Sequence, residues 1–250
     1  MAAQGRLSSN WSGYAITAGP YTSAQGTFTV PSLSSSATCN EEMSEWVGID
    51  GWSNQDLIQA GIGESLKDPA GAGCTTGTFY VWAWWEVLPA ASTLVPLTVH
   101  AGDQVTVVIS QLNGTNWQIV LTDATSHQSA TEGVAYGGPG SSAEWVVEAP
   151  EDPGTCNPGY GAVCFLSPYS PSVPFSATAS NGAVSDLYDV VMQQREQGGL
   201  VDVSTPGPVS SWPSSFAISY TGTGSNSRLM RPLRSAGTSV RVLSHPIYEG

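Results

Sequence analysis

Short runs of β-branched and aromatic residues, separated by turn-forming residues, recur along most of this chain and constrain its fold more than any other feature. Such residues favour the extended backbone, on whose pleated surface their side chains pack well. The sequence predicts strands in this way over residues 26–30, 44–49, 57–59, 79–86, 104–110, 117–122, 143–148 and 215–220. Regular strand spacing of this kind predicts an all-β fold, a sandwich of two antiparallel sheets.

Two turns and one segment of mixed character complete this pattern. The Asn113-Gly114 dipeptide between two of the runs is typical of a hairpin, and Ala101-Gly102-Asp103 predicts a second turn. The 28 glycines and 17 prolines suit a chain of many short strands joined by tight turns. Residues 186–196 have an apolar spacing that permits one short helix, whereas their tyrosine and valines favour a strand.

The distribution of charge divides the chain into two parts. A chain of 250 residues can form one all-β domain with a sizeable core, and a second domain is not required. After residue 223 there is one acidic residue, Glu249, and four of the seven basic residues lie there: Arg228, Arg231, Arg234 and Arg241. We therefore expect a body over residues 1–223 and an Arg-rich extension over residues 224–250 that lies against this acidic body.

The net charge of the chain is strongly negative. Twenty Asp and Glu face seven Lys and Arg, which gives −13, and only 11% of the residues are charged, against about 25% in an average soluble domain. A surface of this sign repels nucleic acids and anionic membranes, so neither is an expected partner. Once the carboxylates are protonated, seven Lys and Arg and three His leave at most ten positive side chains. Low self-repulsion at acid pH predicts acid tolerance.

The four cysteines are even in number and show neither a CxxC motif nor a Cys/His spacing, which argues against a zinc site. We expect two disulfides, Cys39–Cys74 and Cys156–Cys164, out of three connectivities, and with them an oxidising, extracellular compartment. The first residues lack an apolar segment, so a mature, secreted chain is expected. No run reaches the eighteen or so apolar residues of a membrane span.

Most familiar catalytic motifs are absent from the sequence. The three histidines, His100, His127 and His245, lie in turn-like contexts, and there is no Gly-x-Ser-x-Gly elbow, Asp-Thr-Gly motif or His/Glu metal cluster. Carboxylate and amide side chains within strand-like apolar runs remain. Burying such a group costs a few kcal/mol unless it is hydrogen-bonded, so the presence of Gln59 and Glu144 in these apolar runs needs an explanation. In principle, one Glu and one Gln can activate a water and hold an oxyanion.

Seven segments, spread in order over about residues 10 to 222, resemble the glutamic peptidases, or eqolisins. One segment alone would be weak, but seven in the right order make the resemblance specific. They are Asn10-Trp-Ser-Gly-Tyr14, Gly26-Thr-Phe-Thr-Val-Pro31, Trp46-Val-Gly-Ile-Asp-Gly51, Leu57-Ile-Gln-Ala-Gly61, Trp84-Trp-Glu-Val-Leu-Pro89, Ala101-Gly-Asp103 and Ala143-Glu-Trp-Val-Val-Glu148.

This resemblance implies a sandwich related to the concanavalin-type lectin fold and an enzyme that cleaves proteins at acid pH without sensitivity to pepstatin. The catalytic Gln of the family falls on Gln59 and its catalytic Glu on Glu144, while two supporting acids fall on Asp50 and Glu86. No cofactor or metal is implied. The expected partners are protein or peptide substrates, and the expected state is a secreted monomer.

The motifs also suggest roles for further residues of the cleft. We expect three tryptophans to line the cleft and bind substrate side chains: Trp46, Trp84 and Trp145. Glu148 shares the face of Glu144 but lies about 13 Å along the strand, so we expect a solvated strand end there. Two features depart from the family, Val87-Leu88 where aromatic residues are usual, and the connection over residues 51–56.

Two other functions fit a sandwich of this kind. A glycoside hydrolase would use two carboxylates about 5 to 9 Å apart, for example Glu86 and Glu144, and would not need Gln59. A sugar-binding module would use the faces of its tryptophans, and neither Gln59 nor Glu144 would matter.

Overall fold

The computed structural model describes residues 3–70, 73–75, 77–151, 163–180, 186–196, 199–209, 212, 214–223 and 242–243, and every regular element in these ranges is a strand. None of these residues forms a helix that is long and apolar enough to span a membrane. The strands are β1 (Gln4–Ser8), β2 (Trp11–Thr17), β3 (Ser23–Thr29), β4 (Ser32–Leu33), β5 (Glu41–Ile49), β6 (Ile58–Ser65), β7 (Tyr80–Val87), β8 (Thr93–Val95), β9 (Gln104–Asn113), β10 (Asn116–Asp123), β11 (Gln128–Ala135), β12 (Ser142–Glu148), β13 (Phe165–Leu166), β14 (Tyr169–Ser170), β15 (Val173–Ala179), β16 (Asp186–Glu196), β17 (Gly199–Pro206), β18 (Ser214–Tyr220) and β19 (Val242–Leu243).

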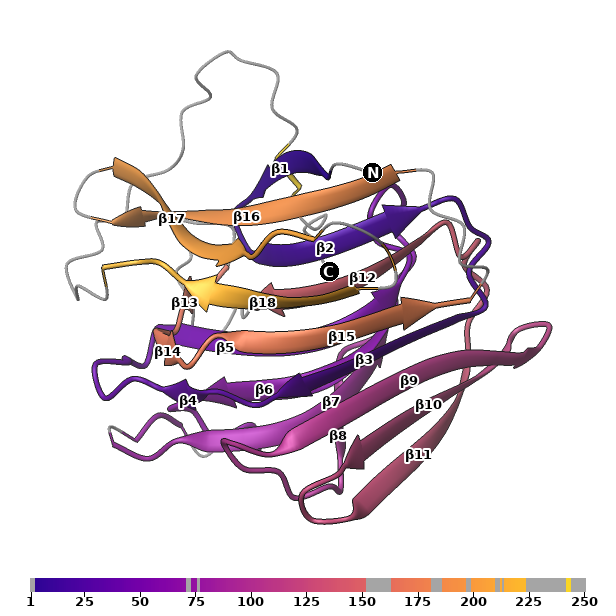
Figure 1. Ribbon diagram of the computed structural model, residues 1–250. Helices are drawn as coiled ribbons and strands as arrows, with labels where there is room; N and C mark the ends of the chain where they lie inside the picture. Colours follow the sequence, from indigo (N-terminus) through magenta and orange to yellow (C-terminus); the bar gives the residue numbers. More distant parts are fainter. Residues whose placement is uncertain are drawn as a thin grey trace.

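The strands form two layers that are joined along one edge (Figure 1). One layer, which we call the catalytic layer because it contains the two predicted catalytic residues, Gln59 and Glu144, has the order β8-β7-β6-β5-β12-β2-β16. The other layer, the back layer, has the order β18-β15-β3-β9-β10-β11. Strand β17 pairs with both β16 and β18 and connects the two. The predicted all-β, largely antiparallel sandwich is confirmed.

The main apolar core lies between the two layers. It takes every second residue of the facing strands, such as Ile49 in β5, Ile62 in β6 and Ile109 in β9. Strands β9 and β10 alternate between buried and exposed residues, as expected for a sheet with one face in solvent. In contrast, β5, β6 and β12 are buried at every residue. The outer face of the catalytic layer is therefore covered as well.

Both turns predicted from the sequence are present. Gly114, with a φ of +52°, lies in the predicted hairpin between β9 and β10, and Gly102, with a φ of +94°, lies in the second predicted turn. The segment of mixed character, residues 186–196, is strand β16 and not a helix. Pairing with β2 and β1 on its two sides satisfies its backbone, which explains why strand propensity prevails there.

The predicted disulfide Cys39–Cys74 is present. Cys164 is also disulfide-bonded, whereas Cys156, its predicted partner, lies outside the described residues. The Arg-rich extension lies outside them too, apart from β19, which pairs in parallel with β1. The division at residue 223 stays a prediction.

Candidate active site

Gln59 and Glu144 lie in one row across the catalytic layer. On β5, Gly48 pairs with Gln59 of β6 on one side and with Glu144 of β12 on the other. Directly paired residues point to the same face of a sheet, so the two side chains share the outer face of this layer. Their Cα atoms are two strand spacings apart, about 9.5 Å. Glu86 of β7 extends the row beyond Gln59.

Gly48, between the two predicted catalytic residues, leaves room for the ring of Trp46. A Cβ atom at residue 48 would lie 2.8 Å from Cζ3 of Trp46 and 3.1 Å from Cδ1 of Leu57. The ring edge of Trp46 and the side chain of Leu57 therefore lie above this glycine, on the row of Gln59 and Glu144. Trp46 is fully buried on the outer face, and its predicted role as a cleft wall stays a prediction.

The side chain of Gln59 is oriented by Glu86. Gln59 Nε2 donates a hydrogen bond of 2.7 Å to Glu86 Oε2. Because an ionised carboxylate can only accept, this contact fixes which end of the Gln59 amide is the nitrogen. Burial raises the pKa of Glu86, and the hydrogen bonds from Gln59 and from the backbone of Ser92 oppose that shift. Only 4% of Gln59 is exposed, and its Oε1 accepts no hydrogen bond within the described structure. One N–H of the amide and its carbonyl oxygen are left for other contacts.

Glu144 is the most enclosed carboxyl group of the row. Its exposed fraction is 0%. Burial raises its pKa well above the ordinary value, the hydroxyl of Ser142 opposes the shift, and the negative charge of Asp50 adds to it. A carboxyl group whose protonation depends so strongly on its surroundings is suited to exchange protons during a reaction.

Asp50 holds together the chain segments that flank the row. Its carboxylate accepts hydrogen bonds from Tyr136 Oη (2.6 Å), Gly140 N (2.7 Å), Ser141 N (2.8 Å), Ser141 Oγ (2.8 Å) and Asn54 Nδ2 (2.9 Å). These donors belong to the connection that enters β12 and to the loop that follows β5. Asp50 is fully buried and has a φ of +70°, a conformation that Asp and Asn tolerate better than most residues. It anchors loops, and the hydrogen bonds of its carboxylate in the described structure do not include one to Gln59.

We expect Asp50→Ala to lower the free energy of unfolding by about 3 kcal/mol or more, because buried N–H donors would lose a charged acceptor. Asp50→Asn is the matched variant, since it keeps the backbone preference and one acceptor oxygen, and it should lose about half as much. Urea unfolding near pH 4 measures both. Equal, small losses below about 0.5 kcal/mol would contradict the anchoring role.

The predicted tryptophans of the cleft lie on different faces. Trp84 pairs with Gly61 on the outer face, and its Nε1 donates a hydrogen bond of 3.0 Å to Ser44 Oγ. Trp145 is on the opposite face of β12, where it packs in the main core, donates from Nε1 to the carbonyl of Gln25 (2.8 Å) and lies 4.6 Å from the ring of Trp212. The prediction of a cleft wall at Trp145 is therefore wrong, because strand alternation turns it away from Glu144.

A model of the peptidase A4 family matches residues 9–207. The chain belongs to this family, the glutamic peptidases or eqolisins. It is 27% identical over 222 residues to aspergillopepsin-2 from Aspergillus niger, which covers 79% of this chain and 74% of that protein.

Solved structures of glutamic peptidases share the fold. Scytalido-glutamic peptidase with a transition state analogue inhibitor has a TM-score of 0.65 at 22% identity, over 85% of this chain and 98% of that one. Aspergilloglutamic peptidase from Aspergillus niger has a TM-score of 0.55 at 23% identity, over 72% and 99%. This glutamic peptidase is thus a peptide hydrolase built on the eqolisin sandwich.

Glu148 of this glutamic peptidase is buried, so the prediction of a solvated strand end is wrong. Its carboxylate accepts hydrogen bonds from Asn10 Nδ2 (3.1 Å), Trp11 Nε1 (3.0 Å) and Trp46 Nε1 (2.7 Å). The two indole rings meet edge to face at 4.9 Å. Burial raises the pKa of Glu148 to about 8, against the effect of these donors. Glu148 fixes Trp46, whose ring lies above Gly48.

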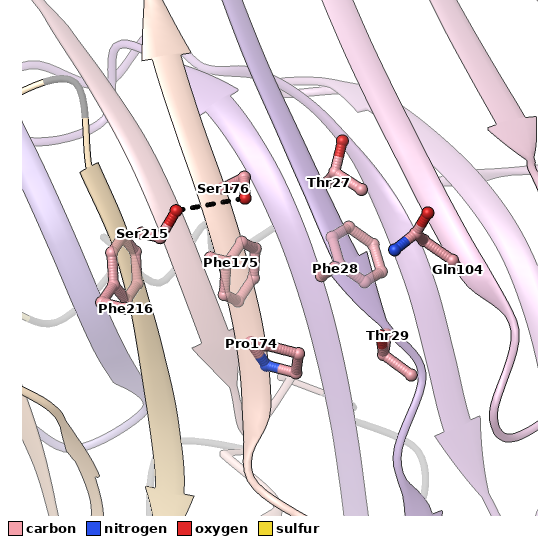
Figure 2. Close-up of a pocket in the computed structure, with 9 residues that line it drawn as sticks. All are labelled: Thr27, Phe28, Thr29, Gln104, Pro174, Phe175, Ser176, Ser215 and Phe216. Atoms are coloured by element: carbon pink, nitrogen blue, oxygen red, sulfur yellow. Dashed lines mark hydrogen bonds between the residues drawn. The ribbon is translucent and has the colours of Figure 1, made fainter.

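The back layer of the peptidase carries a shallow depression, shown in Figure 2. It has a volume of about 350 Å³ and lies over β3, β9, β15 and β18, where Ser176 and Ser215 form a hydrogen bond. Its lining contains no carboxylate, histidine or cysteine, so it offers no acid or base. Among the described residues, no three His, Cys, Asp or Glu side chains converge to hold a metal ion.

Proposed function

We propose that this glutamic peptidase is an acid-active endopeptidase in which Glu144 and Gln59 act together on a water molecule. The observation that carries the proposal is the row Gln59–Gly48–Glu144, which points a carboxyl group and an amide to the same face on both sides of a residue without a side chain. The order of the seven family segments assigns the same two residues. Peptides are the substrate class that family membership supports.

The reaction needs one base, one acid and one oxyanion donor. Ionised Glu144 takes a proton from water as that water attacks the scissile carbonyl carbon, and a tetrahedral oxyanion forms. The free N–H of Gln59 donates a hydrogen bond to this oxyanion. Protonated Glu144 then gives its proton to the leaving nitrogen, the C–N bond breaks, and the carboxylate is regenerated. Glu86 acts through Gln59, as a positioning residue that fixes its amide.

Two properties of the chain support work at acid pH. At most ten positive side chains remain once the carboxylates are protonated, so self-repulsion stays low. Glu148 is buried, and burial favours its neutral form, so acid pH does not force a charge into this part of the fold. The Cys39–Cys74 disulfide supports a secreted protein, and we propose that it acts as a monomer.

The structure gives a reason to prefer the peptidase over a glycoside hydrolase. Glu86 and Glu144 are separated by β6 and β5, three strand spacings or about 14 Å between Cα atoms. Glycosidase carboxyl groups are about 5 to 9.5 Å apart, so these two side chains would have to lean toward each other across Gln59 and Gly48 to reach that separation. Glu86 is in addition engaged by Gln59, so the pair is poorly placed to flank a glycosidic bond.

The proposal is tested by incubating the protein with denatured haemoglobin or casein from pH 2 to pH 7, with and without pepstatin. We expect cleavage confined to acid pH and unaffected by pepstatin. Soluble β-glucan and xylan serve as control substrates and should stay intact. A folded protein that cleaves no protein substrate at any of these pH values would contradict the proposed function.

A further inference from the structure

The two proposed catalytic side chains are enclosed in this structure. Glu144 has no exposed surface and Gln59 only 4%, and three of their oxygens, both of Glu144 and Oε1 of Gln59, accept no hydrogen bond within the described residues. A general base must reach both a water and the scissile carbonyl. Some group must therefore move from above Glu144 before a peptide can bind.

Trp46 and Leu57 lie over Gly48 from below the surface, and Trp52 reaches farther across the outer face. Trp52 belongs to the loop Gly51–Asp56 between β5 and β6, yet its ring packs against Tyr188 of β16 at 4.7 Å between ring centres, tilted by 33°. Strands β12 and β2 separate β5 from β16, a span of about 14 Å (Figure 1). Trp52 also packs against the apolar cluster of the outer face, which includes Trp11, Trp46 and Val146.

The register places this contact directly beside the catalytic row. Glu144 of β12 pairs with Ala15 of β2, and Ala15 pairs with Tyr188. The small side chain of Ala15 leaves the space between Glu144 and Tyr188 open to a ring from above. The direct path from the end of β5 to Tyr188 runs over the outer face beside the positions of Glu144 and Ala15.

Of the two rings, Tyr188 is the fixed one. It lies within strand β16, paired on both sides, and the guanidinium carbon of Arg6 lies 4.7 Å from its ring centre. Trp52 directly follows Gly51, which has a φ of +98° and no side chain. A glycine next to the gate residue can absorb the backbone rotation of an opening while Asp50 stays anchored.

We propose that Trp52 is a specificity-determining residue, a gate over Glu144 that is displaced by a large apolar side chain of the substrate. That side chain, preferably aromatic, stacks on Tyr188 in place of the indole. Opening breaks an aromatic contact, and only a substrate that restores one compensates for the loss. The enzyme should therefore cleave peptides with Phe at the subsite beside Glu144 much faster than peptides with Ala there. This inference rests on the proposed function of Glu144.

The gate is tested first without any turnover. Glu144 is labelled with a water-soluble carbodiimide and an amine near pH 5, and its rate is followed by peptide mass mapping. We expect Trp52→Ala to raise the labelling rate of Glu144 at least tenfold, and the matched variant Trp52→Phe to stay within threefold of wild type. Exposed Asp202 serves as the internal reference. An unchanged rate in folded Trp52→Ala would overturn the proposal.

Specificity is tested with paired peptides that differ only by Phe or Ala at each residue next to the scissile bond. In the wild type, kcat/KM should favour Phe at least tenfold at one of these positions. Trp52→Ala should remove most of that ratio, mainly through faster cleavage of the Ala peptide. Tyr188→Ala should lower kcat/KM for the Phe peptide, and Tyr188→Phe should keep kcat/KM for that peptide near the wild-type value.

An unchanged Phe/Ala ratio in Trp52→Ala, or an equal loss on both peptides, would overturn the proposal. If no variant or wild type cleaves peptides, the proposed function has failed, and the labelling rate of Glu144 still decides whether Trp52 covers it. Far-UV circular dichroism and thermal unfolding establish that each variant is folded.

Discussion

Glu144→Gln is expected to lower kcat for peptide cleavage by at least about 10³-fold, with little change in KM. Glutamine is nearly isosteric, but it can neither take a proton from water nor return one to the leaving nitrogen, and general acid–base catalysis contributes about 10²–10⁴-fold. Loss in kcat without loss of binding is the sign of an interaction made in the transition state. Steady-state kinetics near pH 4 measure both constants.

Gln59→Ala is the companion variant and tests the oxyanion role. Removal of one oxyanion donor typically lowers kcat about 10²–10³-fold. Glu132→Gln, on β11 of the back layer, is the matched control for a neutral substitution of a glutamate and should leave both constants unchanged. Retention of more than a tenth of the activity by folded Glu144→Gln would rule out Glu144 as the general base.

The second large effect concerns two carboxyl groups inside the sandwich. Glu45 of β5 and Glu64 of β6 face the core, with 0% and 1% exposed, and are diagonal neighbours, since Glu45 pairs with Ile62 and Glu64 with Met43. Burial raises the pKa of both well above the ordinary value, and the charge of Glu64 raises that of Glu45 further. The negative charges of Glu45 and Glu64 also act on Tyr169, whose own pKa is raised mainly by burial.

These shifts determine how stability varies with pH. In the unfolded chain both carboxyl groups lose their protons near pH 4.3, whereas in the folded protein they keep them to higher pH. The folded state thus binds more protons above that pH, so the free energy of unfolding is greatest below it and falls as pH rises toward the folded pKa values. For each proton that the folded protein keeps and the unfolded chain has lost, the free energy of unfolding falls by about 1.4 kcal/mol per pH unit.

We therefore expect the double variant Glu45→Gln/Glu64→Gln to lose less stability than wild type as pH rises. Between pH 4.5 and 6.5 the difference in free energy of unfolding should shift toward the variant by about 2.4 kcal/mol or more, since at least one proton of the pair is retained in the folded wild type. Urea unfolding at several pH values measures it, with exposed Asp202→Asn as the control. A difference that does not change with pH would show that the pair is ionised or solvated in the folded protein.

This pH dependence bears on where the enzyme can work. Glu148, with a pKa raised to about 8, and Glu144 add to the same loss of stability above pH 4.3. A fold with many buried neutral carboxyl groups and few positive charges is suited to acid and disfavours neutral pH. Inactivation at neutral pH is thus expected to coincide with loss of the fold.

The sequence determined the family, both predicted turns and eight of the strands: β3, β5, β6, β7, β9, β10, β12 and β18. Runs such as residues 104–110 and 117–122 with Asn113-Gly114 between them specify a hairpin by local chemistry, which needs no knowledge of the rest of the chain. The motifs around Gln59 and Glu144 predict neighbouring strands for the two residues, but β5 lies between their strands in the structure. The positions of Asp50 and Glu86 follow from the same motifs, but their separate contacts do not.

Only the tertiary structure decided which faces and which distant residues meet. Alternation along β12 separates Glu144 from Trp145 but does not say which side is the core, because both faces are buried. For the same reason, the three donors around Glu148 and the pair of Glu45 and Glu64 were not predicted. Trp52 and Tyr188 are far apart in sequence, and their contact depends on the order of four strands. Local propensity acts over a few residues, whereas such contacts arise when strands from the whole chain pair.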